Sequence, residues 1–172
     1  MNNISFPFLT TQRLELTQLE KTDIDALFKL RTHPKTNEFI KRELPKEVNE
    51  LVPFIEKITK GVLNNEYFYW AIKKDKQLIG TICLWNFSED KLTTEIGYEL
   101  HPDFHKKGFM SESLQKVIHF GFSKLDLKAI EAFTHKNNES SIALLNKNNF
   151  IYQPKRRDKG FENNRIFRIE NN

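Results

Sequence analysis

The chain has 172 residues, of which 38% are hydrophobic and 29% charged, a composition typical of one globular domain. Its single cysteine, Cys83, excludes an intramolecular disulfide and a thiolate zinc cluster, and fits a reducing compartment. The net charge of +4 suits a partner such as nucleic acid, an acidic membrane or a phosphate-bearing small molecule. We expect one cytoplasmic domain over residues 1–172, because no signal-peptide pattern opens the sequence and the apolar stretch 78–85 is too short to cross a membrane.

The hydrophobic pattern switches between the strand period and the helix period along the chain. Thr22 as N-cap, with Asp25 at N3, predicts a first helix that Pro34 ends. Pro53 interrupts the next helical pattern and predicts a kink or two short helices. The expected elements are a short strand from Leu14, the helix from Thr22, helical spacing over 46–63, strands at 67–73, 77–86 and 93–100, a long helix after Gly108, a strand at 128–134, a helix at 139–147 closed by a left-handed Asn149, and strands at 150–154 and 165–169.

Strand 93–100, the helix after Gly108 and strand 128–134 form a strand–helix–strand unit. Such a unit predicts a parallel strand pair with a right-handed crossover. The neighbouring strands follow one another as hairpins. We therefore expect an α/β (α+β) protein with a mixed, mostly antiparallel sheet, a central parallel pair and flanking helices.

The loop before the long helix is the most informative segment for function. The free N–H groups and the positive dipole end of a helix favour an anion, and Gly108 allows a phosphate to approach the backbone. Lys106 and Lys107 add positive charge beside it. Taken alone, this local pattern favours a solvated basic loop over a ligand site.

Four blocks in order resemble the GNAT superfamily of acyl-CoA N-acyltransferases, and most closely its RimJ/RimL type of ribosomal-protein N-terminal acetyltransferases. The blocks are Thr-Gln-Arg-Leu-Glu-Leu at 11–16, Leu-Ile-Gly-Thr-Ile at 78–82 with Glu-Ile-Gly-Tyr at 95–98, the pyrophosphate pattern at 105–110, and Asn-Glu-Ser-Ser leading to Phe150. His105 replaces the usual Gln or Arg of the pyrophosphate pattern, and Met110 replaces a small residue, which predicts a narrower site. Leu145 occupies the slot of a Tyr general acid, so the acid is unassigned.

The resemblance implies a GNAT fold with a splayed parallel pair and direct attack of a neutral amine on the thioester of acetyl-CoA, the co-substrate, without a metal. Pyrophosphate would bind the N–H groups of 106–111, and pantetheine would pair with the backbone near Tyr98 to Leu100. A backbone N–H of Glu99 or Leu100 would polarise the thioester carbonyl. The implied cofactor-binding residues are Tyr98, Leu100, His105, Lys106, Lys107, Gly108, Phe109, Met110, Ser111 and Asn138.

Two carboxylates compete for the role of general base. The resemblance points to Glu95, and Glu99 lies four residues further along the strand, on the same face. Either could instead lie at a solvated strand edge. Ser141 is a candidate donor to the leaving thiolate or, more simply, a helix cap.

The acceptor amine is open at this stage. A protein N-terminus, of a ribosomal or another protein, and a small amine both fit. A non-catalytic acyl-CoA sensor is an alternative, while RNA binding rests only on net charge and the basic cluster 155–157. We expect a monomer or homodimer, no membrane partner and no direct nucleic-acid partner, and the five histidines show no metal spacing.

Overall fold

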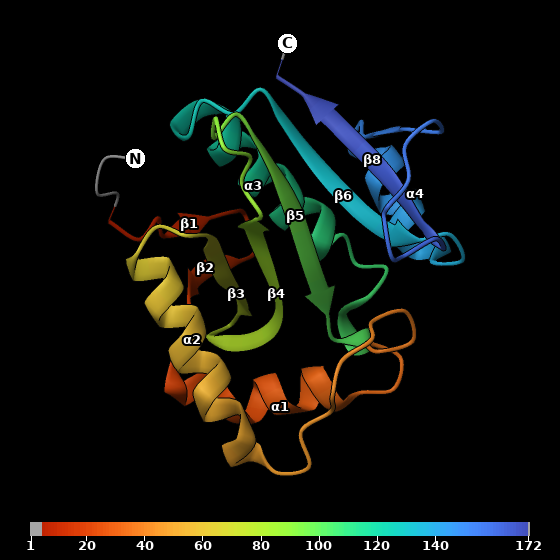
Figure 1. Cartoon of the computed structure of the whole chain (residues 1–172). Helices are drawn as coiled ribbons and strands as arrows, with labels where there is room; N and C mark the ends of the chain where they lie inside the picture. The colour runs from red at the N-terminus through yellow and green to blue at the C-terminus, as the bar shows by residue number, and fades with distance from the viewer. Residues whose placement is uncertain (1–4, 172) are drawn as a thin grey trace. The chain divides into compact units, whose positions relative to one another are not determined.

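The computed structural model describes residues 5–171 (Figure 1). The chain divides into two compact units. The first comprises the described residues up to Cys83 together with Tyr98–Ser113, and the second comprises Leu84–Gly97 together with the described residues from Leu114 onward. Two strands and one helix contribute residues to both units.

Eight strands, four α-helices and three short 3-10 helices are found in the described residues. In chain order they are β1 (Leu9–Thr10), β2 (Glu15–Gln18), η1 (Lys21–Asp23), α1 (Ile24–Thr32), η2 (Val48–Leu51), α2 (Val52–Leu63), β3 (Phe68–Lys74), β4 (Gln77–Trp85), β5 (Thr93–Leu100), η3 (Pro102–Phe104), α3 (Phe109–Lys124), β6 (Ala129–His135), α4 (Glu139–Lys147), β7 (Ile151–Tyr152) and β8 (Asn164–Glu170). The hydrogen-bonded strand order is β1-β2-β3-β4-β5-β6-β8-β7. The predicted mixed sheet is confirmed.

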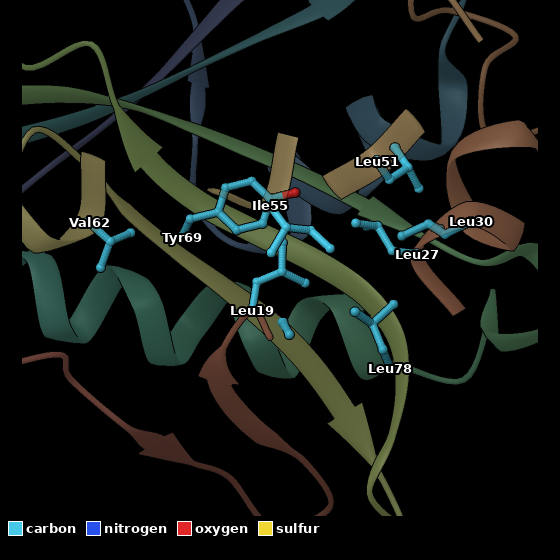
Figure 2. Close-up of a cluster of buried hydrophobic side chains, with 9 residues drawn as sticks. Leu19, Leu27, Leu30, Leu51, Ile55, Val62, Tyr69 and Leu78 are labelled. Atoms are coloured by element: carbon cyan, nitrogen blue, oxygen red, sulfur yellow. The ribbon is translucent and has the colours of Figure 1, made fainter. Parts of the chain in front are cut away.

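The first unit encloses a core between its strands and its two helices. Leu16 of β2 is opposite Ile72 of β3 in the antiparallel register, and both side chains are fully buried. Figure 2 shows the cluster that α1, α2 and the neighbouring strands enclose: Leu19, Leu27, Leu30, Leu51, Ile55, Val62, Tyr69, Ala71 and Leu78. Burying each aliphatic side chain of this kind contributes about 1.5–3 kcal/mol, so the cluster gives the strands a stable support.

The second unit contains the parallel pair. β5 pairs with β6 in parallel over Thr93–Glu95 and Ala129–Glu131, whereas β6 and β8 pair antiparallel along the whole of β6. In Figure 1, β6 and β8 run side by side with α4 next to them. Gly121 lets α3 approach β6 closely, since a Cβ at this position would lie 3.1 Å from Ile130 Cδ1. The register with β6 stops at Glu95 in the described residues, although β5 continues to Leu100.

Most element boundaries lie within one residue of the expected ones, but the strand expected at 150–154 is confined to Ile151–Tyr152. β5 and α4 have the predicted limits, and Pro53 lies at the start of α2, after the separate 3-10 helix η2, so the alternative of two short helices is confirmed. The Thr22 N-cap is wrong, because Glu20 and Asp23 form a capping box that starts a 3-10 turn first. The two-residue strand β1 was not predicted, because it is too short to show a period.

Candidate active site

The loop between η3 and α3 has the backbone shape of an anion site. Lys106 and Gly108 have φ values of 60° and 81°, which is the left-handed region that Gly adopts at low cost. α3 begins directly after, at Phe109, and the first N–H groups of a helix lack partners within the helix. Turns of this kind direct successive backbone N–H groups to one side and bind phosphate.

Both departures from the pyrophosphate pattern have a structural account. The imidazole Nε2 of His105 lies 2.9 Å from the backbone oxygen of Leu100, so this side chain ties the loop to the end of β5. The Met110 side chain is only 7% exposed, and its bulk therefore lies in the interior of the protein. Phe109 beside it is also buried.

A second contact holds the first turn of α3 to the segment before β2. The carboxylate of Glu112 accepts hydrogen bonds from the Thr11 hydroxyl and from the backbone and guanidinium of Arg13, with Arg13 Nη2 2.7 Å from Oε2. Arg13 Nη1 also donates to the backbone oxygen of Lys107 at 3.0 Å, and the guanidinium lies over the ring of Phe109. Burial raises the pKa of Glu112, but the hydrogen bonds from Thr11 and Arg13 outweigh it, and the net shift is downward.

Glu99 lies in a cluster of basic and hydroxyl side chains. Arg42 Nη2 lies 2.5 Å from Glu99 Oε2, and Arg31 Nη1 lies 3.5 Å from Oε1. The side chain of Glu99 is 9% exposed, that of Arg42 14% and that of Arg31 16%. Burial, followed by the charge of Glu99, raises the pKa of the neighbouring Tyr69 phenol well above its usual range. Glu99 therefore serves as the charge partner that two buried arginines require.

Glu95 has different surroundings. Its carboxylate accepts a hydrogen bond from the Asn86 amide at 2.5 Å, and its register partner on β6 is Glu131, which points to the same face of the sheet. Desolvation is the main cause that raises the pKa of Glu95, and the charges of Asp158 and Glu131 add to it, while the Asn86 hydrogen bond works in the opposite direction. Among the described residues no arginine forms an ion pair with Glu95, and its pKa is raised.

Glu131 differs from Glu95 in forming ion pairs with arginine side chains. It is buried and makes ion pairs with Arg156 and Arg168, the latter at 2.7 Å. Desolvation raises the pKa of Glu131, but the hydrogen bonds from these two arginines exceed that effect, and the pKa is lowered overall. Arg157 donates to the backbone oxygens of Pro154 and Arg156. Two of the three cations in the predicted 155–157 cluster thus have partners within the chain.

The N-terminus of α4 corrects one prediction. Asn138, and not Ser141, is the N-cap: its side-chain oxygen accepts from the backbone N–H of Ser141 at 3.1 Å and from the hydroxyl of Ser140 at 3.0 Å. Ser141 occupies the N3 position and is buried. The cap signal in the sequence lies in Asn138, since Asn is among the strongest N-cap residues.

The backbone of β5 at the Glu99–Leu100 peptide lies against Gly80 of β4. A Cβ built on Gly80 would lie 2.5 Å from the backbone oxygen of Glu99 and 2.9 Å from Leu100 Cδ1. The backbone N–H of His101 donates to the oxygen of Ile79 at 2.8 Å and holds the strand end in place. Any side chain at position 80 must displace this part of β5.

Replacing Gly80 with Ala is therefore expected to lower the free energy of unfolding by about 1–3 kcal/mol, the usual cost of overpacking. Urea unfolding followed by circular dichroism measures this change. Gln77→Ala, at an exposed position of the same strand, is the control and should stay within about 0.5 kcal/mol of the unchanged protein. Equal stabilities for both variants would contradict the close contact.

The sequence did not point to several residues that shape these clusters. Arg31, Arg42 and Glu131 lie far in sequence from their partners, and no motif or period marks them. Arg13 lies in the Thr-Gln-Arg-Leu-Glu-Leu block at 11–16, which does not indicate its contact with Glu112. Within residues 5–171, no group of three or more His, Cys, Asp or Glu side chains is placed to hold a metal ion, and no helix is long and apolar enough to span a membrane.

The comparisons with known proteins identify the family. The protein-family model described as the acetyltransferase (GNAT) domain matches residues 13–151 of this sequence. The uncharacterized N-acetyltransferase YoaA of Bacillus subtilis (strain 168) is 32% identical over 147 residues, which are 84% of this chain and 83% of that protein. The chain therefore belongs to the GNAT acetyltransferase family and is an N-acetyltransferase enzyme. Enzymes of this family use acetyl-CoA as the acetyl donor.

Solved structures share the fold. RimL, a ribosomal L7/L12 α-N-protein acetyltransferase in complex with coenzyme A, superimposes with a TM-score of 0.80 at 17% identity, covering 95% of this chain and 98% of that one. The microcin C7 self-immunity acetyltransferase MccE, in complex with acetyl-CoA and AMP, superimposes with a TM-score of 0.79 at 20% identity. The match covers 92% of this chain and 93% of MccE. The predicted GNAT fold is confirmed, and RimL is among the structures that share it.

Proposed function

We propose that this enzyme, acting as one domain over residues 1–172, transfers the acetyl group of acetyl-CoA to a primary amine by direct attack on the thioester. The observation that carries this proposal is the 105–108 loop, in which Lys106 and Gly108 have positive φ ahead of the sixteen-residue helix α3. Successive backbone N–H groups at the positive end of a helix dipole are the usual arrangement for binding phosphate. The pyrophosphate of CoA fits this loop by charge.

The remaining cofactor contacts follow from the same elements. The N–H groups of 106–111 would hold the pyrophosphate, with Lys106 and Lys107 adding charge and His105 fixing the loop to Leu100. Pantetheine would pair with the backbone of β5 near Tyr98 and Leu100, beyond the point where the register with β6 ends. There a backbone N–H of Glu99 or Leu100 would polarise the thioester carbonyl. Asn138 would contact the cofactor through its amide nitrogen, because its side-chain oxygen caps α4.

Glu95 is the general base in this proposal. Its half-buried carboxylate has a pKa that desolvation raises, which makes it a stronger proton acceptor than an ordinary glutamate. Glu99 has a structural role instead, because two arginines occupy its oxygens. Ser141, at the N3 position of α4, stays the candidate that protonates the leaving thiolate.

The preferred acceptor is the N-terminal amine of a protein. An α-amine has a pKa of about 7.7–8.0 and a lysine amine one of about 10.4, so the α-amine is far more often neutral near pH 7. A carboxylate base suffices for that substrate. A ribosomal protein fits because RimL, by its name, acts on the N-terminus of L7/L12. We place this reaction in the cytoplasm, because the free thiol of Cys83 is consistent with a reducing compartment.

A panel assay tests the acceptor class. The unchanged protein is mixed with acetyl-CoA and with peptides that carry a free N-terminus, peptides acetylated at the N-terminus but carrying lysine, or small amines, and thiol release is followed. We expect release with free N-terminal peptides at rates above the other two groups. Preference for small amines would assign the enzyme to a different substrate class. Tight CoA binding without release on any amine would favour an acyl-CoA sensor.

A further inference from the structure

Glu112 poses an electrostatic problem for the proposed cofactor site. Its carboxylate lies in the first turn of α3, the turn whose N–H groups would hold the pyrophosphate. An acidic side chain stabilises the helix at this position but repels a second anion that binds to the same turn. The side chain is 19% exposed, so solvent screens its charge only in part. A positive charge beside the Glu112 carboxylate would remove this repulsion and favour the binding of a phosphate.

Arg13 supplies that charge from another part of the chain. Its Nε donates to Glu112 Oε2 at 2.8 Å, its Nη2 lies 2.7 Å from the same oxygen, and its backbone N–H donates to Oε1 at 2.9 Å. The Thr11 hydroxyl donates to Oε1 as well. Within the described residues, the hydrogen bonds and the ion pair of this carboxylate come from the 11–13 segment, and the Arg13–Glu112 pair has no net charge.

The same guanidinium fixes the direction of the loop. Arg13 Nη1 holds the backbone oxygen of Lys107. In a trans peptide the C=O and the following N–H point in opposite directions, so this bond turns the N–H of Gly108 away from Arg13. A Cβ on Gly108 would lie 3.3 Å from Arg13 Nη2, so the absence of a side chain at Gly108 allows this close approach.

We propose that Arg13 is a positioning residue for CoA binding, which acts through Glu112 by neutralising the carboxylate in the first turn of α3. This proposal rests on the assignment of the 105–111 segment as the pyrophosphate site. It explains why an arginine near the N-terminus, distant in sequence from the loop, belongs to the machinery that binds the cofactor. Arg13 itself need not touch the phosphates.

A double-mutant cycle tests it by isothermal titration of CoA into the unchanged protein, Arg13→Met, Glu112→Gln and the double variant. Arg13→Met should weaken binding by about 10- to 100-fold, the range for losing a charged hydrogen-bonding partner. Glu112→Gln alone should change the affinity by less than about threefold, and the double variant should recover to a similar level. The loss in Arg13→Met should shrink as salt is added, because salt screens the partly exposed Glu112 carboxylate that is left without a partner.

A purely structural contact gives a different result. If Thr11 and Arg13 merely hold α3 in place, Glu112→Gln loses the guanidinium contacts at one of the two carboxylate oxygens and weakens binding to a similar degree as Arg13→Met, and the double variant recovers nothing. That pattern, or unchanged affinity in Arg13→Met, would overturn the proposal while leaving the proposed function intact. Failure of the unchanged protein to bind CoA would overturn both. Lys21→Met, which breaks the exposed ion pair with Glu56, is the control and should bind CoA normally.

Discussion

Glu95→Gln is expected to lower kcat/KM by about 10²- to 10⁴-fold, the usual contribution of a general base. The substitution keeps the size of the side chain and can keep the hydrogen bond with Asn86, but it removes the proton acceptor. The measurement is thiol release from acetyl-CoA at subsaturating acceptor. Glu89→Gln, at an exposed position of the same unit, is the control and should leave the rate unchanged.

The pH profile makes this expectation specific. A base works only when deprotonated, and burial, together with the charges of Asp158 and Glu131, raises the pKa of Glu95. The rate of the unchanged enzyme should therefore fall as the pH drops through a value above about 4.3, the ordinary pKa of Glu. Glu95→Gln should lose the part of this fall that comes from Glu95 and keep only the part that comes from protonation of the acceptor amine. A profile that Glu95→Gln leaves unchanged would remove Glu95 from the role of base.

Glu99→Ala should have the largest effect on stability, a loss of about 3–5 kcal/mol in the free energy of unfolding. The substitution leaves Arg31 and Arg42 mostly buried, close to each other and without the carboxylate that both contact. Urea unfolding measures the loss. If the variant is too unstable to purify, Glu99→Gln keeps a hydrogen-bond acceptor and should lose less.

An exposed ion pair of the same unit provides the control. Glu56→Ala removes the partner of Lys21, where both side chains are more than half exposed, and should cost less than about 1 kcal/mol. Similar losses in Glu99→Ala and Glu56→Ala would mean that the Arg31–Glu99–Arg42 cluster contributes no more than a surface contact. The structural role assigned to Glu99 would then fail.

The local signals in the sequence were sufficient for most of the fold. β5 and α4 were predicted with their observed limits because alternating apolar residues and a helix cap mark them within a few residues. The first helix was more difficult, since Thr22 with Asp25 and Glu20 with Asp23 are overlapping capping signals, and only the second forms. Sequence rules favour Thr over Glu as an N-cap residue, so the observed start at Glu20 does not follow from residue type.

The site depended on contacts that a sequence pattern does not reveal. Period two placed Glu95 and Glu99 on one face of β5, with Glu95 as the first candidate for the base and Glu99 as the second. The two carboxylates differ in their neighbours. Glu99 contacts Arg31 and Arg42, which lie 68 and 57 residues away from it in the sequence. Glu95 has instead Asn86 and the facing acid Glu131. Long-range partners of this kind follow from the fold and not from local spacing.

Intact-mass spectrometry of enzyme and acceptor after mixing with acetyl-CoA tests the central claim most directly. Direct attack predicts that one acetyl group appears on the amine of an N-terminal peptide, that CoA thiol is released in equal amount, and that the mass of the enzyme does not change. Acetylation of the enzyme that precedes product, or no transfer to any amine while CoA binds, would contradict the account.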